Sequence, residues 1–99
     1  MNAIKYIQQH GVDKARELLA RLHNLGCPDD MQITVINGMW HRTANGFTYP
    51  DLKRLVESVD LVNEYGSLRT AKQITWVDNK PRLVQAIADY EAIYGGEHV

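Results

Sequence analysis

The sequence predicts an α+β domain in which a small three-stranded antiparallel sheet, a β-meander, packs against helices. Apolar side chains recur at every third or fourth position before residue 25 and again after residue 50, as on one face of a helix. Between residues 31 and 36 apolar and polar side chains alternate, which is typical of a strand with one buried face. Two dipeptides, Asn37-Gly38 and Asn45-Gly46, indicate tight turns between strands. Together these patterns predict the element order α-α-β-β-β-α-α-α.

The first two helices are expected at about residues 2–10 and 12–24. Asn2 can accept a backbone hydrogen bond as an N-cap, and Gly11 can adopt the left-handed conformation that ends a helix. The Gly, Pro and two Asp residues between positions 25 and 30 then predict a loop.

The three strands are expected at about residues 31–36, 39–44 and 47–49. Asn37-Gly38 supplies the two positive-φ positions of a type I′ hairpin turn between the first two strands. We expect the second strand to lie in the middle of the meander. Its alternation places Trp40 and Arg42 on one face and His41 on the other, so the register decides which of them is buried.

Three further helices are expected at about residues 49–65, 68–75 and 80–94. Thr48 and Asp51 stand three apart as in a capping box, and Pro50 falls in the first turn, where its missing N–H is tolerated. Ser67 can cap the next helix. The run Trp-Val-Asp-Asn at residues 76–79 is expected to end that helix before the last one begins.

Length and charge limit the class of protein. The 99 residues predict one domain over residues 1–99, with 11 basic and 12 acidic side chains and a formal net charge of −1. A generic polyphosphate binder would carry a basic excess and a nucleic-acid mimic an acidic one, so both are disfavoured. No apolar run reaches the roughly 18 residues that cross a membrane. One cysteine cannot form an intrachain disulfide, which suits a reducing cytoplasm.

The residues that could carry enzyme or metal chemistry are few. The chain has no Gly-rich nucleotide loop, no Gly-x-Ser-x-Gly elbow, no His-Glu-x-x-His and no Cys-x-x-Cys. The nearest approach to a metal site combines His23, Cys27 and His41, but the Gly and Pro beside Cys27 indicate that the helix has already ended there. Asp29 and Asp30 form a solvated turn rather than a catalytic pair. We therefore expect no catalytic residue, no metal and no cofactor.

The segment from residue 66 to residue 91 carries a second pattern. A Gly-Ser at Gly66, an Ala-containing helix with Ala71, and Pro81 near the start of the next helix follow one another in this order. With one inserted residue, the order resembles the N-terminal helix-turn-helix of LysR-type transcription regulators. The resemblance implies that four residues face the major groove of DNA: Asn79, Lys80, Arg82 and Gln85.

The local charge weakens the DNA interpretation. Asp78, Asp89 and Glu91 offset the basic residues of this segment, so attraction to phosphates would be weak. A packed three-helix elbow uses the same Gly, cap and apolar spacing without DNA. DNA binding by the helix from Lys80 to Tyr94 is therefore the alternative function.

Four segments carry a resemblance that covers most of the chain. They are the opening helix–Gly–Lys-Ala-Arg elbow that ends at Arg16, the β segment leading into residues 51–58, the elbow at residues 66–72 and the ending at residues 83–96. With them the chain is similar to small early-region accessory proteins of temperate tailed phages of enteric bacteria. The resemblance implies a non-enzymatic protein, made in an infected bacterium, that binds and modulates or inhibits a host protein in host takeover or anti-defence. It implies no catalytic residues.

Aromatic residues supply the candidates for partner binding. Five Tyr and two Trp residues offer the amphipathic rings favoured at interfaces, although a small core uses the same residues. The candidate partner-binding residues are Trp40, Arg42, Tyr49, Trp76 and Tyr94. The expected partner is a host protein of unknown identity in the bacterial cytoplasm. Nucleic acid is the second choice, no membrane partner is expected, and a homo-oligomer is left open.

Overall fold

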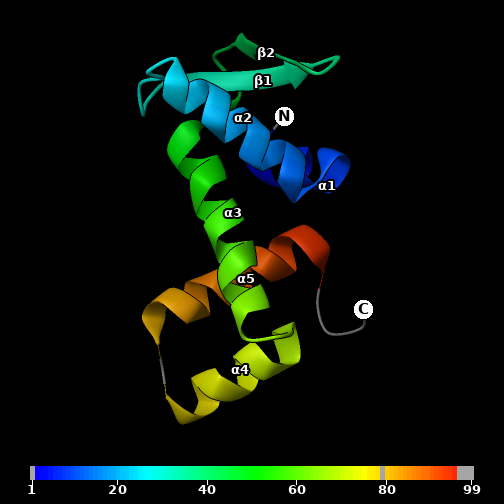
Figure 1. Ribbon diagram of the computed structural model, residues 1–99, viewed down its shortest axis with the longest axis vertical. Coiled ribbons are helices and arrows are strands. Elements are labelled where there is room, and N and C mark those ends of the chain that lie inside the picture. Colours follow the sequence, from blue (N-terminus) through cyan, green and yellow to red (C-terminus); the bar gives the residue numbers. More distant parts are fainter. Residues whose placement is uncertain (1, 79, 96–99) are drawn as a thin grey trace. The chain divides into compact units, whose positions relative to one another are not determined.

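The computed structural model describes residues 2–78 and 80–95, which form five helices and a three-stranded antiparallel sheet (Figure 1). The elements are α1 (Ala3–His10), α2 (Val12–Asn24), β1 (Gln32–Ile36), β2 (Met39–Arg42), β3 (Phe47–Thr48), α3 (Tyr49–Glu64), α4 (Leu68–Val77) and α5 (Pro81–Tyr94). This confirms the α+β class and the predicted element order. The chain divides into two compact units, Met1–Arg54 (unit 1) and Leu55–Val99 (unit 2), described in turn below. The expectation of one domain over residues 1–99 stays a prediction.

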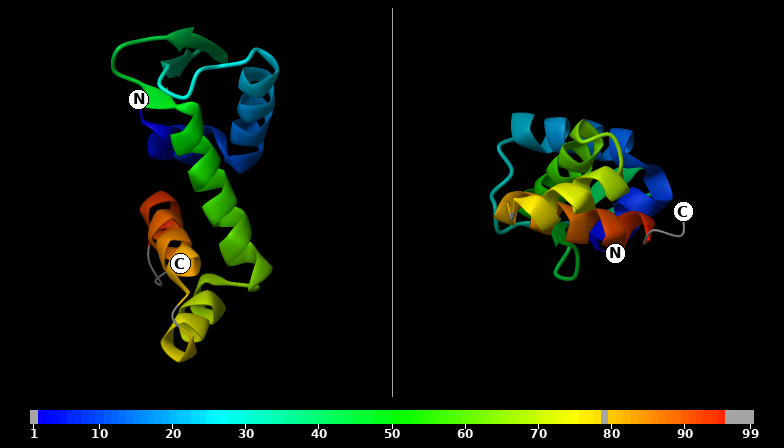
Figure 2. Two further views of the ribbon diagram at one scale, coloured as in Figure 1. Left: turned by 90° about the vertical axis from the view of Figure 1, so that its left-hand side faces the viewer. Right: turned by 90° about the horizontal axis from the view of Figure 1, so that it is seen from below.

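Unit 1 begins with two helices joined at one glycine. The Asn2 Oδ1 atom accepts a hydrogen bond of 2.8 Å from the Lys5 backbone N–H, so the predicted N-cap is confirmed. Gly11 has a φ of 87°, a conformation that side chains disfavour, and its N–H donates to the Ile7 carbonyl. The bend at this residue lets α1 and α2 contact each other (Figure 2).

The hairpin of β1 and β2 has the predicted turn. Asn37 and Gly38 have φ values of 52° and 79°, which are the two positive angles of a type I′ turn. The register pairs Val35 with Trp40. Because paired residues project on the same face, Trp40 shares the face of the buried Val35 and is itself half-buried.

The predicted meander is wrong in its strand order, which is β2-β1-β3 with β1 in the centre. The second strand also ends at Arg42, not at residue 44, and Asn45-Gly46 is no hairpin turn. Instead, the chain crosses close to β1, and a Cβ atom on Gly46 would overlap the Ile33 carbonyl group. After this crossing Phe47 pairs with Ile33 on the far side of β1.

Burial of Phe47 explains the crossing. On β3, beside the central strand, the Phe47 side chain is only 3% exposed, and its ring lies 5.6 Å, centroid to centroid, from that of Tyr6 on α1. The chain has no other phenylalanine, so burying it adds substantially to the small core of unit 1.

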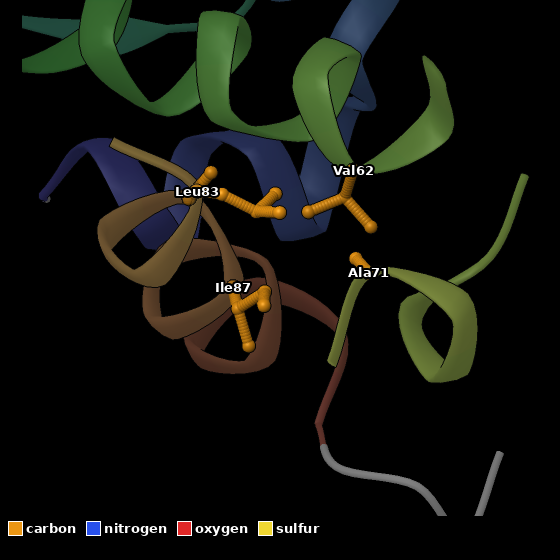
Figure 3. Packing of buried hydrophobic residues seen from close by; sticks show 5 residues of the cluster. Val62, Ala71, Leu83 and Ile87 are labelled. Carbon is orange, nitrogen blue, oxygen red and sulfur yellow. The ribbon is translucent and has the colours of Figure 1, made fainter. Parts of the chain in front are cut away.

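Unit 2 is built around a small apolar cluster. The cluster joins three helices, with Val62 from α3, Ala71 from α4 and Leu83 and Ile87 from α5 (Figure 3). Ala86 completes it. These are the residues that the helical spacing places on the inward faces.

The starts of α3 and α4 follow the predicted capping, whereas the end of α4 does not follow the prediction. The Asp51 backbone N–H donates to the Thr48 Oγ1 atom at 3.3 Å, and the Thr70 N–H donates to the Ser67 Oγ atom at 3.2 Å, as their capping positions predict. The expected end of α4 at residue 75 is wrong, because the helix continues to Val77. Trp and Val only weakly disfavour a helix, and the Asp78 N–H closes the last turn on the Ile74 carbonyl.

A buried polar network links α3 to α5. The Ser58 hydroxyl donates to the Asp89 Oδ2 atom at 2.7 Å, and both residues are buried, with exposures of 0% and 6%. The Gln85 amide donates to the other carboxylate oxygen at 3.1 Å, and the Arg82 guanidinium approaches the Ser58 Oγ atom at 3.4 Å. In the sequence, Asp89 stood out only as one of the charges that offset the basic side chains of residues 66–91. The carboxylate is instead satisfied inside unit 2, which makes the pairing of these two helices directional.

We predict that Ser58→Ala destabilises the protein by about 1–3 kcal/mol, because it removes a donor from a buried carboxylate. Urea unfolding of the wild type, Ser58→Ala, Asp89→Asn and the double variant measures this cost. The double-mutant cycle should give a coupling energy above about 0.5 kcal/mol between the two positions. Additive effects of the two substitutions would contradict the direct interaction.

Candidate partner-binding surface

The C-terminal end of α4 exposes two adjacent apolar side chains. Trp76 is 81% exposed and Val77 is 90% exposed. Leu68, Ala71 and Ile74 supply the inward face of α4, so the last two residues of the helix are left outside. A large, rigid indole in water is the kind of side chain that protein interfaces cover.

The last helix also carries exposed apolar side chains. Tyr94, the final residue of α5, is 41% exposed, and Val84 is 45% exposed. The Tyr94 ring lies 4.8 Å from the Tyr90 ring, centroid to centroid, at an angle of 51°. Tyr90 packs against the core cluster, so this contact holds Tyr94 in place.

The aromatic candidates for partner binding in unit 1 are less exposed than those in unit 2. Trp40 is half-buried on the edge strand, and Tyr49 is half-buried at the start of α3. Arg42 is exposed opposite Ile33. The register therefore assigns Trp40 partly to the core.

Sequence reasoning missed an exposed apolar pair at the hairpin tip. Ile36 and Met39 are directly paired across the two strands and are 54% and 67% exposed. The alternation of side chains along the two strands could have predicted their exposure, because both residues lie on the face opposite to Val35 and Trp40. It also missed Ser58 and Asp89, whose spacing from apolar neighbours places each on an inward helix face.

Three of the residues proposed for DNA contact, Lys80, Arg82 and Gln85, have partners within the described part of the chain. The Lys80 Nζ atom lies 4.0 Å from the Asp78 carboxylate. Arg82 and Gln85 donate into the buried network around Ser58 and Asp89. Asn79 lies outside the described residues.

The structure also describes the His, Cys and Asp residues that were weighed for metal or catalytic chemistry. Among residues 2–78 and 80–95, no three His, Cys, Asp or Glu side chains form a group that could hold a metal ion. The half-buried Cys27 thiol donates a weak hydrogen bond of 3.5 Å to the Pro28 carbonyl. Burial, and secondarily the Asp29 carboxylate, raises the pKa of this thiol. The thiolate, which is the nucleophile and metal ligand, is thus disfavoured.

None of the helices that the structure describes has the length and apolar character to cross a membrane. Comparison of the chain with protein-family models, curated proteins and solved structures gives no significant match. The phage resemblance and the helix-turn-helix resemblance therefore stay predictions from the residues that carry them.

We predict that Cys27 reacts with iodoacetamide along a pH profile whose midpoint lies above that of a free cysteine, about 8.5. The raised pKa keeps the thiol protonated at mildly alkaline pH, so the reaction accelerates only at higher pH. Asp29→Asn should lower the midpoint because it removes a repelling charge. Asp30→Asn, one residue further along the loop, is the matched control, and an equal effect of both variants would rule out this assignment.

Proposed function

We propose that this protein is a non-enzymatic accessory protein of the phage type, which binds a host protein in the bacterial cytoplasm and modulates or inhibits it. The observation that carries the proposal is the pair of exposed apolar side chains, Trp76 and Val77, at the end of α4. The resemblance of the chain to early-region phage proteins supplies the biological setting.

The large exposed indole of Trp76 is the side chain that gains most from burial against a partner. A tryptophan side chain offers about 150–250 Å² of surface, and burial of apolar surface contributes about 25 cal/mol per Å². Truncation of such an anchor in a protein interface commonly costs about 2 kcal/mol or more. Tyr94 and Val84 on α5 add further apolar surface in the same unit. A protein partner that covers this indole therefore gains more binding free energy than a partner that only neutralises charge.

The charges favour a protein partner over DNA. The formal net charge is −1, and the described candidates for DNA contact have partners within the chain. Arg82 and Gln85 could reach a phosphate or a base only by leaving the network around Asp89. DNA contact would therefore leave the buried carboxylate with fewer donors, which costs free energy.

We predict that the tagged full chain captures one stoichiometric protein from bacterial lysate and that Trp76→Ser reduces its recovery at least about tenfold, as expected for loss of an anchor residue. The matched control is Leu25→Ser, which removes an apolar side chain that is 65% exposed in unit 1. Circular dichroism of both variants checks the fold. Recovery of nucleic acid, of nothing, or of the same protein at the same level with Trp76→Ser would overturn the proposal.

We predict that the full chain does not bind a random-sequence DNA duplex even at low ionic strength, where phosphate contacts are strongest. Fluorescence anisotropy of a labelled duplex measures this directly. If binding appears, falls steeply with salt and is weakened by Arg82→Gln but not by Arg69→Gln on α4, the helix-turn-helix interpretation is correct instead.

A further inference from the structure

A hollow of about 150 Å³ opens in unit 1 between α1, α2 and the hairpin. We propose that it binds a small organic carboxylate. The carboxylate would lie among the cationic and N–H groups of His10, Lys14 and Arg21, and the apolar body would lie against Leu18 and Val35. The site lies apart from the exposed end of α4 in sequence and does not rest on the proposed function.

The charged wall has a net positive charge in a chain that is slightly acidic overall. Lys14 and Arg21 supply two cations against the single carboxylate of Glu17. In the described part of the chain, the Arg21 side chain makes no ion pair or hydrogen bond, so its guanidinium is available to a ligand. An arginine can bind a carboxylate through two parallel hydrogen bonds.

The Lys14 contact with Glu17 is weak enough to be replaced. Their charged atoms lie 3.5 Å apart, and the two side chains are 66% and 59% exposed. Exposed pairs of this kind contribute about 0–1 kcal/mol. A carboxylate ligand can therefore compete with Glu17 for the ammonium group.

Tyr6 lies at the edge of the hollow with a hydroxyl suited to donation. Its side chain is buried, and its O–H reaches the Lys14 carbonyl only at 3.4 Å, which is long for a hydroxyl hydrogen bond. Burial raises the pKa of this phenol, with a smaller contribution from Glu17 in the same direction and an opposing one from Arg21. The phenol is thus protonated at neutral pH and can donate to a carboxylate oxygen. The His10 ring, 4.9 Å from the Tyr6 ring between centroids, adds N–H capacity beside it.

Size and wall chemistry select a carboxylate over a phosphate. A cavity of about 150 Å³ holds a molecule of the size of benzene. A phosphate dianion would leave Leu18 and Val35 without an apolar partner, and Glu17 would repel it more strongly than a monoanion. The source of the carboxylate is either a free acid or the C-terminus of a peptide, since both present the same group.

The test is a titration of the ¹⁵N-labelled full chain with sodium benzoate at constant ionic strength, followed by amide chemical shifts. We predict saturable shifts around Leu18 and Gly38, both at the hollow. Benzamide, which has the same shape without the charge, and inorganic phosphate should each bind about tenfold more weakly or not at all, as loss of one charge-assisted contact implies. Comparing the binding of Phe-amide with that of Gly-Phe, which has a free C-terminus, tests whether the carboxylate can come from the end of a peptide. Binding of Gly-Phe assigns a peptide terminus, and binding of benzoate alone assigns a free acid.

Variants separate this site from general charge effects. Arg21→Gln should weaken benzoate about tenfold, while Arg16→Gln, which removes the same charge from α2 outside the hollow, should change the Kd less than about twofold. Glu17→Gln should tighten binding about two- to threefold because it removes the competitor for Lys14. Trp76→Ser should leave benzoate binding unchanged, so the two proposals fail separately. Absence of saturation, equal binding of benzamide, or equal effects of the two arginine variants would overturn the site.

Discussion

The chain crosses the backbone of Ile33 at Gly46, and this crossing sets the arrangement of unit 1. It places Phe47 beside the central strand, where its ring meets that of Tyr6 on α1. Because Phe47 takes one side of β1, the hairpin partner β2 becomes the opposite edge, and Trp40 is only partly covered there. The same contact fixes the position of the Tyr6 phenol, which borders the hollow. A glycine that permits close approach of two backbone segments therefore determines both the sheet order and the geometry of a candidate site.

In unit 2 a polar contact has the corresponding role. Apolar burial alone is not directional, and a cluster of Ala, Val, Leu and Ile side chains permits small rotations of one helix against another. The hydrogen bond from Ser58 to Asp89 restricts this freedom, since another rotation would deprive the buried Asp89 Oδ2 atom of its donor from α3. The Gln85 amide donates to the same carboxylate, and the Arg82 guanidinium approaches the Ser58 hydroxyl. The polar side chains at the start of α5 thus serve the fold, while Trp76 at the end of α4 remains in water.

Local sequence patterns predicted the features that depend on interactions between residues close in sequence. The helices follow from apolar spacing, and the type I′ turn follows from Asn37-Gly38, because both depend on neighbours in sequence. The strand order could not be predicted in this way. Asn45-Gly46 resembles Asn37-Gly38 in sequence, and the two dipeptides take different roles because Phe47, which follows the second one, pairs with the distant Ile33. Asp89 was missed for a related reason. A carboxylate suggests a surface position, and only the partner on another helix shows how a buried one is satisfied.

The net charge of the whole chain does not predict the charge of a local site. A formal charge of −1 argues against polyanion binding over the whole surface. It does not describe the hollow, where the fold places Lys14 and Arg21 against the single carboxylate of Glu17. A small acid needs only a few oriented donors and an apolar wall of matching size, whereas duplex DNA needs cations spread along its phosphates. A chain that is acidic overall can therefore bind nucleic acid poorly and still hold a carboxylate. The small carboxylate interacts mainly with the charges inside the hollow, whereas a DNA duplex interacts with charges over a much longer stretch of surface.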